Sequence, residues 1–309
     1  MRALQRLLVG VSFAVLLSAM GADLASAAPT YTPVWNSGFE NGFPGGEWLP
    51  YDNGSWSPAG TMPAGRVSAW TITGTSEPVF EGDHAFRGWI VGSGSDNHRA
   101  YPGISAGDPA NIHEPIDTPL VNSYMIWLDA DYDAMSPSDW ISIGTWANNT
   151  AWIVHTLSVR DRKLRTAHTD PFEGEYIGPL PRPDFPLRRW VRITVYIEYN
   201  GATGFTQIWQ DGVPMLRGSW TQTAGTQLLR AHWGLYANPA VDYALLYNDD
   251  NKIWTLDAPL SDLVREPIPI PEPRRAFGDG AALAMLGGAF YRRRARRRTA
   301  LRVGADSRS

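Results

Sequence analysis

The sequence repeats a pattern of short segments in which apolar and polar residues alternate, separated by Gly, Pro, Asn and Asp. A period of two is typical of strands that bury one face, and no amphipathic helical pattern of about 12 residues is found. Asp211-Gly212 adds a two-residue hairpin signal. We therefore expect an all-β sandwich with strands at 66–73, 85–91, 123–129, 140–146, 152–159, 190–199, 205–210, 230–237 and 252–256.

The composition supports this fold class and excludes several functions. The chain of 309 residues holds 30 Gly and 24 Pro, which favours turn-rich β structure. It has no Cys, which excludes disulfide scaffolds, Cys-ligated zinc, iron–sulfur clusters and thiol catalysis. With 14 Trp and 43% apolar residues, it is not a long disordered chain.

The first 27 residues have the three parts of a secretory signal peptide. Arg2 and Arg6 form a positive start, residues 7–20 are apolar, and Ala25-Ser26-Ala27 is a small-residue cleavage site. We expect residues 1–27 to direct export and residues 28–265 to form one folded domain. A retained anchor helix is the alternative.

The C-terminal end combines a Pro-rich linker with a short apolar segment. In residues 266–273 every second residue is Pro, which predicts a stiff extended chain. In residues 274–309, a mostly apolar run at 276–291 precedes seven residues, 292–298, of which six are Arg. The run is shorter than the ~20 apolar residues of a stable span, and the Arg cluster would stay on the cytoplasmic side.

Pro271-Glu272-Pro273, followed by these two segments, resembles the PEP-CTERM protein-sorting signal. The resemblance implies transient membrane association, cleavage by an exosortase-type protease, and a final location in the cell envelope, at the surface or outside the cell. A basic tail that binds nucleic acid is the alternative, but an exported protein meets little nucleic acid. We therefore expect no nucleic-acid partner.

Charge is segregated along the chain. Residues 28–266 hold 15 Lys and Arg against 27 Asp and Glu, a net charge of −12, whereas the whole chain carries −4. Two expected strands nevertheless present aromatic and ionic residues on one face. These are Trp190, Arg192 and Tyr196 in 190–199, and Arg230, His232 and Tyr236 in 230–237. We expect a glycan-binding groove there; an ordinary solvent-exposed face is the alternative.

Four short motifs stand out in the body of the chain: GFENGF at 38–43, NHRAYPGI at 97–104, IWQDGVPML at 208–216 and HWGLYANP at 232–239. With them the body resembles concanavalin A-like jelly-roll proteins, and among these the heparin lyase I-like polysaccharide lyases. The resemblance implies a jelly-roll β-sandwich of two antiparallel sheets. It also implies β-elimination on uronic-acid polymers, in which a cation neutralises the carboxylate, a base takes the C5 proton and an acid protonates O4.

The resemblance assigns candidate residues to these roles. Tyr236 is the candidate acid, Arg99 the neutralising cation, and His232 stands where the family usually has Lys. His155 matches the family's base, although its alternation with apolar neighbours also fits a core residue, and His98 is the rival base or substrate ligand. His232 lies about 13 Å along the strand from Tyr236, so we expect one shared cleft without direct contact.

Asp129, Asp131 and Asp133 have the first spacings of a calcium loop. The turn Gly and the final Glu of such a loop are missing, so a solvated turn is the alternative. No other cofactor is expected.

Together these features predict an exported protein that recognises polysaccharide, with lyase activity as the leading hypothesis. The alternative is a noncatalytic lectin-like or biofilm-matrix protein. Hydrolysis is less expected, because no strand carries the paired carboxylates that it needs.

Overall fold

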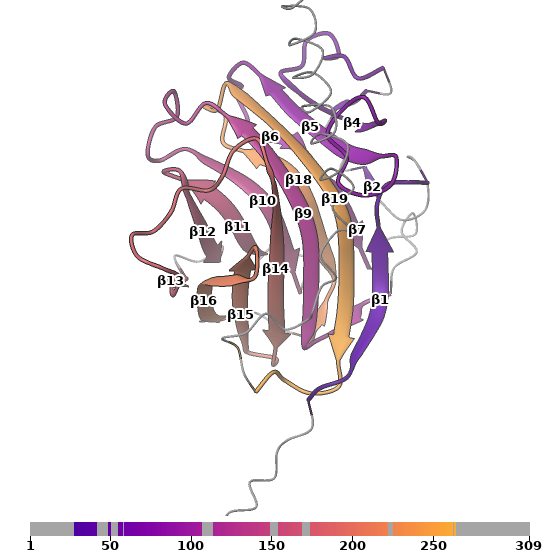
Figure 1. Cartoon of the computed structure of the whole chain (residues 1–309), viewed down its shortest axis with the longest axis vertical. Helices are drawn as coiled ribbons and strands as arrows, with labels where there is room; N and C mark the ends of the chain where they lie inside the picture. Colours follow the sequence, from indigo (N-terminus) through magenta and orange to yellow (C-terminus); the bar gives the residue numbers. More distant parts are fainter. Residues whose placement is uncertain are drawn as a thin grey trace, which may run out of the picture. The chain divides into compact units, whose positions relative to one another are not determined.

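The computed structural model describes residues 28–41, 49–50, 55–57, 59–106, 114–148, 154–168, 174–221, 225–261 and 263. Within these ranges the chain forms strands and no helix (Figure 1), so none of the described part has a helix that could span a membrane. The predicted signal peptide 1–27, the Pro-rich linker 266–273 and the tail 274–309 lie outside the described residues.

The larger sheet has ten strands in the order β13-β16-β15-β14-β9-β19-β5-β4-β3, with β1 also paired to β19. Its strands are β1 (Tyr31–Ser37), β3 (Ser55–Trp56), β4 (Ser68–Thr73), β5 (Ala85–Val91), β9 (Leu120–Ala130), β13 (Glu175–Tyr176), β14 (Trp190–Tyr199), β15 (Thr203–Gln210), β16 (Val213–Thr221) and β19 (Tyr243–Leu256).

The smaller sheet has seven strands in the order β12-β11-β10-β18-β7-β2, with β6 also paired to β18. Its strands are β2 (Leu49–Pro50), β6 (His98–Ala100), β7 (Pro102–Ser105), β10 (Trp140–Ala147), β11 (Val154–Arg160), β12 (Lys163–His168) and β18 (Arg230–Ala237). A separate pair joins β8 (Ile116–Asp117) and β17 (Gln227–Leu228).

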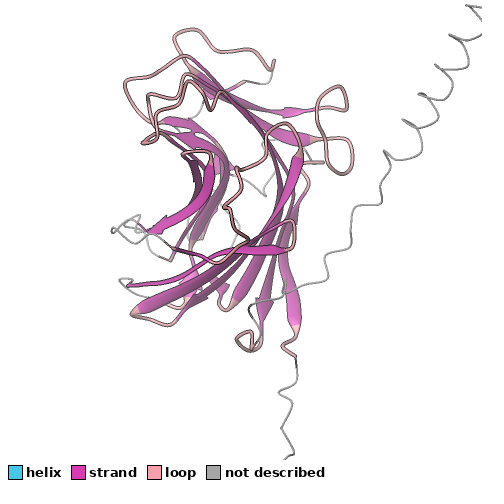
Figure 2. Ribbon diagram, turned by 60° about the vertical axis from the view of Figure 1, so that its left-hand side comes forward, coloured by secondary structure: helices cyan, strands magenta, loops and turns pink. Residues whose placement is uncertain are grey.

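The two large sheets face each other as the layers of a β-sandwich (Figure 2). Every pairing in the described part is antiparallel except β3 with β4, which is parallel. The expected sandwich of two antiparallel sheets is therefore confirmed, with this one parallel pair and the small third sheet as differences.

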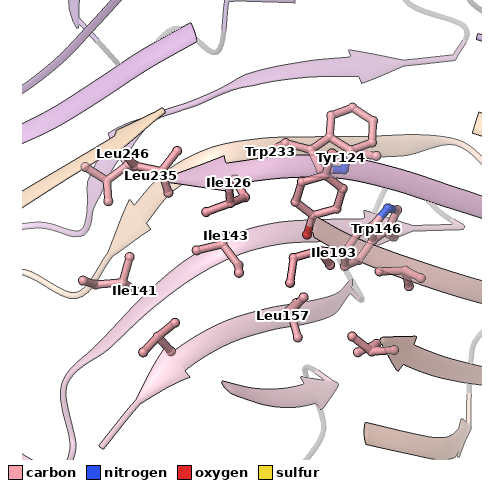
Figure 3. Packing of buried hydrophobic residues seen from close by; sticks show 14 of the residues in the cluster. Tyr124, Ile126, Ile141, Ile143, Trp146, Leu157, Ile193, Trp233, Leu235 and Leu246 are labelled. Atoms are coloured by element: carbon pink, nitrogen blue, oxygen red, sulfur yellow. The ribbon is translucent and has the colours of Figure 1, made fainter. Parts of the chain in front are cut away.

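The core fills the space between the sheets (Figure 3). Side chains from β10, β11 and β18 meet those from β9, β14 and β19, and the largest of them include Trp146, Trp233 and Tyr124. Asn122 Oδ1 accepts hydrogen bonds from the indole nitrogens of Trp146, at 3.1 Å, and Trp233, at 2.7 Å. These bonds matter because a buried indole N–H without a partner would cost free energy.

The nine expected strands all coincide with strands of the structure. The ranges 85–91, 190–199 and 230–237 match at both ends, whereas the others differ, most of all β19, which begins at Tyr243 and not at 252. Residues 152–153 of one expected strand lie outside the described part. The hairpin at Asp211-Gly212 is confirmed, since both residues have positive φ, 49° and 79°, and connect β15 to β16. Ten described strands were not expected: β1, β2, β3, β6, β7, β8, β12, β13, β16 and β17. Seven of them have four residues or fewer, and β16 was indicated only by the hairpin signal before it.

Candidate functional site

The candidate site lies on the outer face of the smaller sheet, along β18. This strand pairs with β10 on one side and with β6 and β7 on the other. Ala231, Trp233 and Leu235 belong to the core, so alternation directs the residues between them to the opposite face. The outward residues are Arg230, His232 and Tyr236, and Arg99 on β6 stands opposite Tyr236 in the register.

Tyr236 contacts Asn97, Trp140 and Arg99, besides the rings of Tyr101 and His232. The Asn97 side-chain amide donates a hydrogen bond to its hydroxyl at 2.9 Å, and the Trp140 ring meets its ring edge-on at 4.9 Å. The Arg99 guanidinium lies 5.9 Å from the centre of the Tyr236 ring. Because the amide of Asn97 is the donor, the hydroxyl of Tyr236 keeps its own proton to give to another group.

Arg99 differs from the eight described cations that are seen paired with carboxylates, because it has no carboxylate partner among the described residues. Its contact is the ring of Tyr236. A guanidinium that is not already engaged by a carboxylate can bind one from a ligand in a bidentate manner.

His232 lies beneath this pair. Its ring stacks on Tyr101 with centroids 3.9 Å apart, and only 4% of the residue is exposed. Burial lowers the pKa of His232 to about 3, so the imidazole is neutral above about pH 4. Its ring meets Tyr236 edge-on at 6.1 Å, so the expectation that the two side chains are too far apart for contact was wrong.

The local backbone explains this contact. Between β10 and β18 the register shifts at a β-bulge, and Gly234 in β18 has a φ of +127°. A Cβ at Gly234 would come within 3.0 Å of Tyr101 and of the Phe86 ring. Glycine therefore allows Tyr101 to lie close against β18, where its ring meets both His232 and Tyr236.

The structure places the two candidate bases, His155 and His98, away from this face. His155 is 1% exposed in the core, stacked on Trp220 at 4.7 Å, with Nε2 bonded to Thr166. It is a core residue, as its apolar alternation allowed, and cannot reach a ligand on the outer face. His98 is 2% exposed on the same face of β6 as Ala100 of the core, opposite to Arg99.

The prediction that residues of 190–199 and 230–237 line one glycan-binding groove is wrong. Trp190, Arg192 and Tyr196 lie on β14, in the larger sheet, whereas Arg230 and His232 lie in the smaller one, so they do not share a face. On the larger sheet, Phe80 covers Trp190 with ring centroids 5.7 Å apart.

The other two side chains on β14 are engaged within the fold. Arg192 lies 3.7 Å from Asp250, and its guanidinium is 5.9 Å from the Phe80 ring. Tyr196 is 1% exposed and donates a hydrogen bond to Glu198 at 2.8 Å. Alternation gives the face of each strand, but it does not say which strands share a sheet.

The three aspartates proposed for calcium do not meet at one point. Asp129 accepts hydrogen bonds from Arg188, at 2.9 Å, and Tyr243, at 3.1 Å. Asp131 accepts bonds from the backbone of the following turn, and Asp133 pairs with Arg162. Within the described ranges, no group of three or more His, Asp or Glu could hold a metal ion. The residues fit a structural turn.

Three residues of the site were not assigned from the sequence: Asn97, Tyr101 and Trp140. Asn97 and Tyr101 flank His98 and Arg99 within the NHRAYPGI motif, and Trp140 begins an expected strand. The motif was a usable signal, but contact with Tyr236 comes from the pairing of β18 with β6 and β10.

No protein-family model matches the chain, and no curated protein matches it. Several solved structures are similar. An endo-β-1,4-glucuronan lyase from Trichoderma reesei is 18% identical over 64% of this chain and 90% of its own, with a TM-score of 0.42. The catalytic domain of a glycoside hydrolase family 131 protein from Coprinopsis cinerea is 13% identical over 76% and 98%, with a TM-score of 0.42.

An alginate lyase from Klebsiella pneumoniae is 14% identical over 59% of this chain and 85% of its own, with a TM-score of 0.38. At these identities, the likeness is limited to the β-sandwich fold.

Proposed function

We propose that this chain binds an acidic polysaccharide on the outer face of the smaller sheet and cleaves it by β-elimination. The observation that carries the proposal is Arg99, a guanidinium without a carboxylate partner among the described residues, beside the phenol of Tyr236.

The residues divide the reaction as follows. Arg99 binds the uronate carboxylate and withdraws electron density, so the C5–H bond becomes more acidic. The base takes the C5 proton, the C5 electron pair forms the C4–C5 double bond, and the C4–O4 bond breaks. Tyr236 gives its hydroxyl proton to O4, and the product carries an unsaturated uronate end.

His232 is the base in this proposal. Its lowered pKa keeps the imidazole neutral at working pH but also makes it a weak proton acceptor. An anionic uronate bound beside it favours the imidazolium, so substrate binding raises its basicity. Tyr101 fixes the plane of the ring through the 3.9 Å stack.

The second candidate function is noncatalytic binding, as in a lectin-like or matrix protein. It is favoured by the same low pKa of His232 and by Tyr101 and Trp140, whose aromatic rings suit stacking against sugar rings. It predicts binding of oligosaccharides without any unsaturated product.

The sequence supports a matching location. We propose that residues 1–27 direct export and that Pro271-Glu272-Pro273, with the residues after it, directs sorting and cleavage by an exosortase-type membrane protease. The mature domain would then meet polysaccharide in the envelope, at the surface or outside the cell.

The test is the ultraviolet absorbance of unsaturated uronate ends, measured with the purified protein and a panel of polyuronates. We expect a signal with at least one polymer and a fall of roughly 10²–10⁴-fold in Tyr236→Phe. Tyr243→Phe is the matched control, because its hydroxyl bonds to Asp129 on the larger sheet. Oligosaccharide binding with no absorbance change would leave the noncatalytic function; equal rates in Tyr236→Phe and wild type would remove Tyr236 from the reaction.

A further inference from the structure

Two different side chains flank the candidate acid on the smaller sheet. Arg99 on β6 stands opposite Tyr236 in the register, with its guanidinium 5.9 Å from the centre of the Tyr236 ring. The Trp140 ring, at the start of β10, lies 4.9 Å from the same ring. Because β6 and β10 pair with opposite edges of β18, Arg99 and Trp140 lie on opposite sides of Tyr236.

All three side chains can be reached from the outside. Arg99, Tyr236 and Trp140 are each partly exposed, between the buried and the fully exposed residues of the sheet. The residue that follows Trp140 is Ile141 of the core, so alternation places Trp140 on the same outer face as Tyr236. A ligand on this face can therefore touch a cation, a phenol and an indole at once.

The chemistry of β-elimination gives its own order to the groups of the polymer. The carboxylate is attached to C5 of the unit that gains the double bond, and O4 is attached to the neighbouring C4. The other carbon bonded to O4 is C1 of the unit that leaves. The carboxylate, O4 and the leaving unit therefore follow one another along the chain.

The side chains of the site have the same order. Arg99 meets the carboxylate and Tyr236 meets O4 in the proposed reaction, so the leaving unit lies beyond Tyr236, on the side of Trp140. A rigid indole offers a broad apolar surface to the C–H face of a sugar ring at a small entropic cost. The Asn97 amide, 2.9 Å from the Tyr236 hydroxyl, holds the phenol between the two positions.

We propose that Trp140 binds the leaving unit and thereby fixes the direction of the polysaccharide on the sheet. The non-reducing part of the chain lies over Trp140, and the reducing part lies over Arg99. This inference rests on the proposed function for its substrate class. After cleavage, the fragment with the new reducing end departs from Trp140, and the fragment with the unsaturated end departs from Arg99.

Two uronate ligands separate the two positions. An unsaturated dimer lacks O4 at its unsaturated end, so it fills the Arg99 side alone, whereas a saturated oligomer of six units fills both sides. Their affinities are measured by calorimetry in the Tyr236→Phe background, where the longer ligand stays intact. Trp140→Ala should weaken the six-unit oligomer about tenfold and leave the dimer unchanged, whereas Arg99→Gln should weaken both.

Two further variants separate lost stacking from a damaged fold. Trp140→Phe keeps an aromatic ring, so it should retain most of the affinity for the six-unit oligomer. Trp127→Ala is the matched control, because Trp127 is also a partly exposed indole that meets a tyrosine ring edge-on, Tyr247 at 5.3 Å, but it belongs to the larger sheet. It should change the affinity for neither ligand.

Weaker dimer binding in Trp140→Ala, or unchanged binding of the six-unit oligomer, overturns the inference. Its failure is separable from that of the lyase proposal. The expected binding pattern without unsaturated product from wild type leaves the two positions and removes the lyase, and product formation without any Trp140 effect does the reverse. If neither ligand binds, both proposals fall.

Discussion

The outer faces of the two sheets carry similar residues but differ in how their charges are paired. On the larger sheet, Arg87 contacts Glu77 at 3.3 Å and Arg188 contacts Asp129 at 2.9 Å. On the smaller sheet, Arg99 lies against the Tyr236 ring and pairs with no described carboxylate. Residue type alone therefore does not identify a binding face; the presence of an internal partner decides whether a cation is available.

The larger sheet also has a cover. The segment between β4 and β5 lies on its outer face, where Glu77 accepts a hydrogen bond from Tyr247 at 2.7 Å and Phe80 packs on Trp190. The Phe80 and Glu81 amides donate to Asp249 at 2.8 and 3.1 Å. Aromatic and ionic residues there hold the fold together, whereas those around Tyr236 leave a cation for a ligand.

The largest expected effect is on stability, in Arg192→Ala. This change leaves the buried Asp250 with only Lys252 as an ionic partner and removes the contact with Phe80. Breaking a buried pair costs about 3–5 kcal/mol, and we expect the low end because Lys252 remains. Urea unfolding measures the loss; unchanged stability with weakened glycan binding would reverse the roles given to the two faces.

Arg99→Ala should show the opposite behaviour. We expect oligouronate affinity to fall about 10- to 100-fold, since a hydrogen bond to a charged group contributes about 1.5–3 kcal/mol. Urea unfolding should stay within about 0.5 kcal/mol of wild type, because no carboxylate loses a partner. A large loss of stability without a change in affinity, measured by calorimetry, would contradict the assignment of Arg99 to the ligand.

One buried titratable group near each face should give opposite pH dependences. Burial lowers the pKa of His232 from 6.5 to about 3, so its contribution to stability is full above pH 6.5 and is lost as pH falls toward 3. Burial raises the pKa of Asp249 from 3.8 to about 7, so stability is full below pH 3.8 and is lost as pH rises toward 7.

Thermal unfolding of His232→Gln and Asp249→Asn between pH 3 and 8 checks these signs. Relative to wild type, His232→Gln should lose less stability on acidification, and Asp249→Asn should lose less as pH rises from 4 to 7. If both variants follow the wild-type pH profile, neither group titrates with a shifted pKa.

The smallest effect is expected for Arg217→Ala. Its pair with Glu175, at 2.9 Å, lies at the end of the larger sheet with both side chains more than half exposed. Exposed pairs contribute little, so we expect a change within about 0.5 kcal/mol in urea unfolding and none in binding. A loss comparable to that of Arg192→Ala would show that pairing on this face stabilises regardless of burial.

The strands and their faces could be predicted, because alternation is a local property of the sequence. The inward set of β14, Val191, Ile193, Val195 and Ile197, is confirmed as core. The candidate site could be predicted only in part. Arg99, His232 and Tyr236 meet, but His155 and His98 turn inward, and Trp190 belongs to the other sheet.

The sequence by itself determined the all-β class, the positions of nine strands and the Asp211-Gly212 hairpin, since each depends on residues close together in the chain. Only the tertiary structure decided that β18 pairs with β6, which brings Arg99 to Tyr236 across 137 positions of sequence. It also decided which arginines are paired with carboxylates. These outcomes depend on contacts between distant strands. The pattern of residues within one strand does not show which other strand pairs with it.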